Sequence, residues 1–174
     1  DSKSTDAFKF KNQTSENLLR VVNPISTNMS VMRNSLIPGL VNVLRDNLNN
    51  QQKRVRIFEL GRTFHCNKKI TAGENTVHGI EQPYCLAALI YGSTHEEQWG
   101  SDEKYVDFFD LKKILLNISE HQLIKFKKIN SEVSFLHPGR AALIHIESDK
   151  PDSYNALSLL DSKFVGYIGE LHPR

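Results

Sequence analysis

One carboxylate in the chain falls in line with apolar neighbours and therefore needs a partner. Residues 54–64 have the composition of a long strand, on which Val55, Ile57 and Glu59 share one face. A carboxylate half-buried among apolar side chains requires a cation or hydrogen-bond donors. Two interpretations stay open, a structural ion pair and a contact with a substrate. The candidate cations are Arg33, Arg62 and Arg140.

A second polar motif, His137-Pro138-Gly139-Arg140, has the composition of a tight turn. Proline pre-sets φ, and glycine tolerates positive φ. We expect this turn to precede a strand over residues 141–146. The alternative interpretation makes Arg140 a polar contact at the open end of a sheet.

A basic cluster with an interleaved aromatic residue comprises Lys125, Phe126, Lys127 and Lys128. Such a pattern is typical of surfaces that bind RNA. Alternation along a strand explains it as well, because it places basic residues on the solvated side and apolar residues mostly inward. We interpret the cluster as a solvated face, with an RNA-binding module acting through this basic face as the alternative. The inward residues would be Ile124, Phe126 and Ile129.

Metal and nucleophilic chemistry find little support. His65 and Cys66 are adjacent, so on a strand they would point to opposite faces and could not bind one ion together. Cys66 and Cys85 lack metal-type spacing, and we expect both to be free thiols. No Gly-x-Ser-x-Gly elbow or Walker-type run occurs, and the nine glycines are scattered.

Leucines at four-residue spacing predict an amphipathic helix in the first third of the chain. Because Pro38 and Gly39 interrupt the pattern, we expect a short helix followed by a second one with Pro38 in its first turn. The leucines are Leu36, Leu40, Leu44 and Leu48. The possible N-caps are Ser26, Asn28 and Ser30.

A second helix is expected near residues 107–120, capped by Asp107. Its core stripe would be Phe108, Leu111, Leu115 and Ile118. The almost unbroken apolar run 84–91 predicts a central strand covered on both faces. Other strands are expected at 18–22, 54–64, 141–146, 156–160 and 164–168. This order favours an α+β fold, a mainly antiparallel sheet flanked by helices.

The bulk composition is that of a globular domain. The 174 residues carry 22 basic and 20 acidic side chains, a net charge of +2. We expect one domain over 18–174, preceded by a loose polar lead-in at 1–17. No apolar run reaches membrane-spanning length, so we expect a cytoplasmic protein without a membrane partner. The absent Met at the start and the stop after a strand-like run suggest a piece of a longer protein.

Four segments together resemble the bacterial phenylalanyl-tRNA synthetase beta subunit family. Residues 23–40 (NPISTNMSVMRNSLIPGL) are similar to the family pattern NPIS…MRxSLxPGLL. The other three follow in the right order, at compatible distances, and the resemblance covers about Leu18 to Arg174. They are residues 56–64 (RIFELGRTF), 107–113 (DFFDLKK) and 136–142 (LHPGRAA).

The resemblance implies a truncated class II aminoacyl-tRNA synthetase-like core that performs no activation chemistry. In that family the enzyme is a heterotetramer of alpha and beta chains that charges tRNA(Phe) with phenylalanine, using ATP and magnesium. The alpha chain holds the active site. We therefore expect a non-catalytic structural module, with no cofactor of its own, that assembles with the alpha subunit and supports it.

Residues 61–65 resemble a strand of the family's alpha chain, with His65 where an arginine that holds the ATP α-phosphate would stand. An imidazole lacks the permanent charge and forked donors of guanidinium. The third conserved motif does not occur before Arg174. We therefore expect no catalytic, cofactor-binding or metal-binding residue. We expect a structural polar network of Glu59, Arg62 and Arg140. The expected subunit interface is Met32, Arg33, Leu36, Pro38, Leu40, Leu44 and Leu48.

Overall fold

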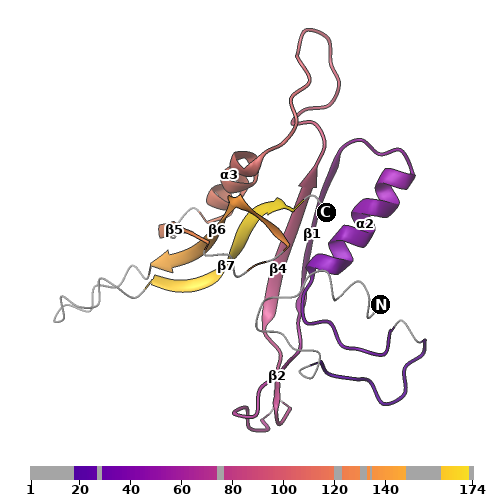
Figure 1. Cartoon of the computed structure of the whole chain (residues 1–174), viewed down its shortest axis with the longest axis vertical. Helices are drawn as coiled ribbons and strands as arrows, with labels where there is room; N and C mark the ends of the chain where they lie inside the picture. Colours follow the sequence, from indigo (N-terminus) through magenta and orange to yellow (C-terminus); the bar gives the residue numbers. More distant parts are fainter. Residues whose placement is uncertain are drawn as a thin grey trace, which may run out of the picture. The chain divides into compact units, whose positions relative to one another are not determined.

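The computed structural model describes residues 18–26, 29–73, 77–119, 123–129, 133, 135–147 and 162–172. They belong to two compact units, Asp1–Lys104 and Tyr105–Arg174. Each unit combines an α-helix with antiparallel strands, which confirms the α+β class (Figure 1). The predicted lead-in 1–17 and the predicted strand 156–160 lie outside the described residues. That residues 18–174 act as one domain stays a prediction. Among the described residues, no helix is long and apolar enough to cross a membrane.

In the first unit, helix α2 (Ile37–Asn49) packs on a two-stranded sheet (Figure 1). Strand β1 (Val55–Arg62) pairs antiparallel with β4 (Tyr84–Tyr91). A smaller antiparallel pair, β2 (His65–Cys66) and β3 (Ile80–Glu81), lies between them in sequence. The alternation of β1 was predicted, and its Val55 is buried with two residues around the start of α2. Those two are Leu36 and Leu40.

Helix α2 begins one residue before Pro38, as expected, because a proline in the first turn sacrifices no intrahelical hydrogen bond. The predicted caps Ser26 and Ser30 are wrong for this helix. Its N-cap is Leu36, which makes no side-chain cap, and Ile37 N donates to Ser35 Oγ at 3.2 Å instead.

The segment just before α2 is not helical, so the predicted short first helix is wrong for residues 30–36. Val31 forms an antiparallel bridge with Arg20, and Met32 N donates to the Leu19 carbonyl at 2.8 Å. These contacts with residues 19 and 20 satisfy backbone groups of the segment that a helical turn would otherwise pair. The strand predicted at 18–22 is reduced to this bridge.

Strand β4 has the predicted bounds, but it is not covered on both faces. Among the described residues it pairs with β1 alone. Several of its large side chains, including Tyr84 and Leu86, are exposed. An apolar run predicts that a strand will be covered, and it does not say which chain supplies the cover.

In the second unit, helix α3 (Phe108–Ile118) accompanies a three-stranded antiparallel sheet in the order β5-β6-β7. The strands are β5 (Leu123–Lys128), β6 (Leu136–Glu147) and β7 (Ser162–Leu171). Helix α3 contacts β7, and Lys112 Nζ lies 4.5 Å from the ring centroid of Phe126 on β5. The helix therefore covers the face of the sheet to which Phe126 belongs.

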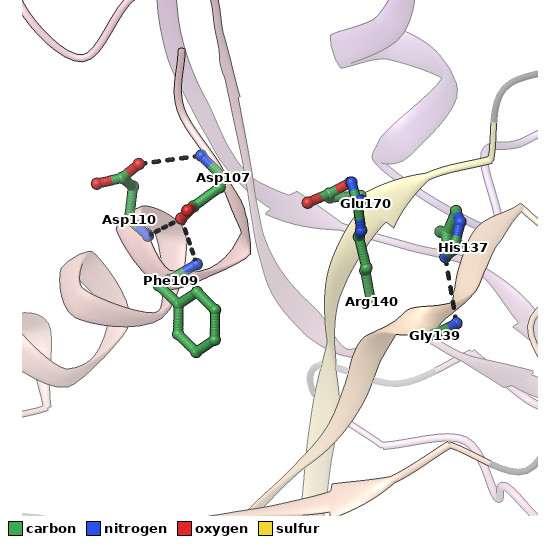
Figure 2. Close-up of polar contacts among 7 residues, drawn as sticks. All are labelled: Asp107, Phe109, Asp110, His137, Gly139, Arg140 and Glu170. Carbon is green, nitrogen blue, oxygen red and sulfur yellow. Dashed lines mark hydrogen bonds and ion pairs between the residues drawn. The ribbon is translucent and has the colours of Figure 1, made fainter. Parts of the chain in front are cut away.

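Asp107 caps α3 as predicted, through a reciprocal capping box (Figure 2). Its Oδ1 accepts hydrogen bonds from the backbone N–H groups of Phe109 and Asp110, at 2.8 and 3.1 Å. Asp107 N donates in return to Asp110 Oδ2 at 2.9 Å. The predicted core stripe is wrong at its end, since solvent reaches Ile118 at the last residue of the helix.

The motif His137-Pro138-Gly139-Arg140 lies inside β6, so the predicted turn before the strand is wrong. Pairing with β7 jumps from Leu136↔Leu171 to Ala141↔Gly169, which leaves the motif out of the regular register. Proline cannot donate to a ladder and is confined to such irregularities. Gly139 N donates instead to His137 Nδ1 at 3.2 Å (Figure 2).

We expect Asp107→Ala to lower the free energy of unfolding by about 1 kcal/mol, because two backbone N–H groups lose their acceptor. The measurement is the urea midpoint of helical circular dichroism. The matched control is Asp102→Ala, an exposed carboxylate ahead of the helix, which should leave the midpoint unchanged. Equal shifts for both variants would contradict the capping role.

Candidate functional site

Of the three candidate arginines, Arg33 is the one that pairs with Glu59 in the structure. Arg33 Nη1 donates to Glu59 Oε1 in an ion pair, and Arg33 Nε donates to the backbone carbonyl of Arg62 at 2.9 Å. The two paired side chains are 45% and 33% exposed, so solvent screens part of their attraction. The guanidinium thus connects the segment before α2 to two points on β1. Of the two open interpretations of Glu59, this geometry is that of the structural ion pair.

Gly61 provides the space in which Arg33 reaches Glu59. A Cβ at position 61 would overlap Arg33 Nη2 and would lie 3.3 Å from Arg33 Cζ. The demand is therefore steric, because any side chain here would push against the guanidinium. A glycine two residues after a carboxylate, on the same face of a predicted strand, is a sequence signal that another side chain passes over the strand to reach the carboxylate.

The other two predicted cations have different partners. The Arg62 guanidinium lies 5.1 Å from the ring centroid of Tyr84, its cross-strand neighbour. Arg140 Nη1 donates to Glu170 Oε2 at 2.8 Å (Figure 2). Of the predicted polar network, the structure therefore joins Glu59 to the Arg62 backbone through Arg33, and it pairs Arg140 with Glu170.

Electrostatics keep Arg140 charged. Its hydrogen bond with Glu170 and then the charge of Glu170 raise the pKa of Arg140, and the charge of Asp107 adds to this, while desolvation opposes it. Because an arginine pKa already lies far above physiological pH, Arg140 stays charged throughout the neutral range.

His65 belongs to a series of contacts among three polar side chains that the sequence did not predict. Its Nε2 lies 3.1 Å from the Thr63 hydroxyl oxygen, and that hydroxyl lies 3.4 Å from Cys85 Sγ. Thr63 is the buried polar residue at the centre of this series. The imidazole is therefore tied to the interior of the unit by its ring nitrogen. Both cysteines are free thiols, with Cys66 exposed and Cys85 half-buried.

The predicted interface residues fall into three groups in the structure. Leu36 and Leu40 are buried within the chain itself, and Arg33 is engaged with Glu59. Leu48 is exposed at the far end of α2. The half-buried members are Met32, Pro38 and Leu44.

Several large apolar side chains of the first unit are exposed on the opposite side of its sheet from α2. Phe58 and Leu60 on β1 are 75% and 64% exposed, and Tyr84 and Leu86 on β4 are 66% and 57% exposed. The register sets Leu60 opposite Leu86, and Arg62 opposite Tyr84. We name this surface the open β1–β4 face. Contiguous exposed apolar patches mark docking surfaces in folded proteins.

Comparison with known proteins identifies the family of the chain. The profile of the family described as "Phenylalanyl tRNA synthetase beta chain CLM domain" matches residues 1–174. The chain belongs to this family. A phenylalanine–tRNA ligase beta subunit of Bordetella parapertussis is 40% identical over 159 residues. The corresponding proteins of Cupriavidus pinatubonensis and Burkholderia pseudomallei are 41% and 43% identical over 159 residues.

These alignments cover 91% of the present chain and 18% of each relative's length. The beta-chain CLM domain is thus one part of much longer curated relatives. The resemblance drawn from four short segments is confirmed. It extends beyond them, since the family profile also includes the polar residues 1–17.

We expect Gly61→Ala to lower the free energy of unfolding by about 1 kcal/mol or less, because the new methyl group displaces Arg33 from a partly exposed ion pair. A double-mutant cycle with Arg33→Ala tests this, since the cost of Gly61→Ala should vanish once Arg33 is gone. Gly166→Ala is the control, because a Cβ there meets nothing within 4 Å. Additive costs at positions 33 and 61 would contradict the steric link.

Proposed function

We propose that this chain is a non-catalytic, class II synthetase-like module of a phenylalanine–tRNA ligase beta subunit. In this proposal it assembles with the alpha subunit and supports the active site there. The whole enzyme would be a cytoplasmic heterotetramer that charges tRNA(Phe) with phenylalanine, using ATP and magnesium. Membership of the beta-chain CLM family supports the parent enzyme. The open β1–β4 face supports the assembly role.

The open β1–β4 face carries the proposal because it leaves large apolar side chains in water. Burying such side chains is worth about 25 cal/mol per Å² of apolar surface, so four of them favour association strongly. The face also has a cationic end, where Arg62 lies over Tyr84. A fitting partner is a protein surface with an apolar centre and a carboxylate near the position of Arg62. We assign the alpha subunit to this role.

Helix α2 has a supporting part in this arrangement. Leu36 and Leu40 hold it on the covered side of the sheet, and Arg33 fastens its leading segment to β1. Met32 and Pro38 sit at the same end of the helix. Leu44 and Leu48 carry the apolar stripe toward the exposed end, where a second contact with the alpha subunit can form.

Three described polar residues of the first unit, His65, Arg33 and Arg62, do not form an arrangement suited to ATP. A phosphate site needs permanent positive charge placed where negative charge develops. His65, at the arginine position of the resemblance, faces a buried threonine hydroxyl. Arg33 and Arg62 are engaged by Glu59 and by the Tyr84 ring. In this proposal these residues take no part in a chemical step.

Replacing Phe58 by Ser should weaken association with the alpha subunit about ten-fold or more, because a large ring leaves the buried centre of the interface. The measurement is titration of labelled beta subunit with alpha subunit. Val77→Ser is the matched control, because Val77 is an exposed apolar residue of the same unit outside strands β1 and β4. Equal affinities of the Phe58 variant and the wild type would overturn the assignment of this face.

The purified chain should show no phenylalanine-dependent ATP–pyrophosphate exchange. In the intact enzyme, His65→Ala should leave the exchange rate unchanged apart from effects of stability. Loss of one phosphate-directed cation in a working site costs roughly 100-fold in rate. Exchange by the chain alone, abolished by His65→Ala, would contradict the non-catalytic proposal.

A further inference from the structure

The sheet of the second unit has a face opposite the one that α3 covers, and its side chains form two rows across the three strands. In the first row Lys125 lies opposite His145, which lies opposite Phe164. In the second row Lys127 lies opposite Leu143, which lies opposite Tyr167. Cross-strand partners in an antiparallel sheet share a face. Each row thus begins with a lysine on β5 and ends with an aromatic ring on β7.

A β-bulge puts the two rings on the same face. Phe164 and Tyr167 are three residues apart, so in a regular strand they would point to opposite faces. The register shifts between Ile144 and His145, and this inserts one extra residue on β7. The rings then meet, with 5.0 Å between the centroids of Phe164 and Tyr167 and 5.8 Å between His145 and Phe164.

The outer rings and the lysines of these rows are accessible. Phe164 and Tyr167 on β7 are 44% and 36% exposed, and Lys125 and Lys127 are exposed on β5, across β6 from the rings. Lys128, the third lysine of the cluster, is also exposed and belongs by alternation to the same face of β5 as Phe126. The sequence did not separate it from the other two.

We propose that this face, comprising Lys125, Lys127, Leu143, His145, Phe164 and Tyr167, binds a single-stranded segment of RNA. Exposed aromatic rings offer stacking surfaces to unpaired bases, and lysines on the same face of a sheet can neutralise phosphates. Lysine is depleted at the centre of protein–protein interfaces, so the paired lysine rows favour RNA over a protein partner. That the RNA is an unpaired part of tRNA rests on the proposed function, whereas the chemistry of the face does not.

The test uses the intact ligase, with both subunits, and a short unstructured oligouridylate carrying a fluorescent label. Fluorescence anisotropy gives the dissociation constant over a series of salt concentrations. Lys125→Gln with Lys127→Gln should weaken binding about ten-fold at low salt, and should make the slope of log affinity against log salt shallower by about 1.4. Phe164→Leu with Tyr167→Leu should weaken binding about ten-fold and leave the slope unchanged, because stacking releases no counterions.

Lys128→Gln is the matched control, since it removes the same charge from the adjacent residue on the other face. It should change neither affinity nor slope, and RNA sites elsewhere on the enzyme contribute equally to all variants. Photocrosslinks from 4-thiouridine should map to the peptide that contains Phe164 and Tyr167. An equal effect of Lys128→Gln, unchanged binding by the aromatic variant, or weaker alpha-subunit association in the double lysine variant would overturn the inference.

The two proposals fail in different ways. Normal assembly with alpha subunit and unchanged RNA binding in all these variants would refute the RNA face alone. Failure of the wild-type chain to associate with alpha subunit would refute the assembly role. The comparison of Lys127→Gln with Lys128→Gln would then still test the RNA face on the beta subunit.

Discussion

The arrangement of the first unit depends on the guanidinium of Arg33. It reaches from the segment before α2 to the Glu59 carboxylate and the Arg62 carbonyl on β1, across the space that Gly61 leaves open. These contacts hold the segment before α2 against one side of the β1–β4 pair. The leucines near the start of α2, Leu36 and Leu40, are buried there. Among the described residues α2 covers one side of the pair, and large apolar side chains on the other side are exposed. The proposed docking function is a direct consequence of this one-sided cover.

Spacing predicted most of the local structure. Four-residue periodicity with Pro38 in the first turn predicted α2, and Asp107 predicted the start of α3, because caps and helix faces are set by neighbouring residues. The apolar run 84–91 predicted β4 to the residue. Its cover was predicted wrongly, since a hydrophobic run records that burial occurs without recording the partner. The motif at 137–140 was taken for a turn because proline and glycine are compatible with both a turn and an interrupted strand.

The site was harder to predict because its contacts join residues distant in sequence. Three arginines were equal candidates for Glu59, and only the fold brings Arg33 to it. The contacts from His65 on β2 through Thr63 to Cys85 on β4 follow no local sequence pattern. Similarly, the bulge that gathers Phe164 and Tyr167 is a property of pairing, so the basic cluster on β5 could not be connected with aromatic residues nearly forty positions later. The four sequence motifs predicted the family, and the exposed faces of the two sheets could be recognised only from the structure.

We propose that the alpha subunit covers the open β1–β4 face. Hydroxyl-radical footprinting of the beta subunit, alone and with saturating alpha subunit, measures the solvent exposure of Phe58, Leu60, Tyr84 and Leu86 directly. We expect strong protection of all four side chains on addition of alpha subunit, with no change at the exposed control Val77. Unchanged labelling of the four side chains in a complex that has formed would contradict it.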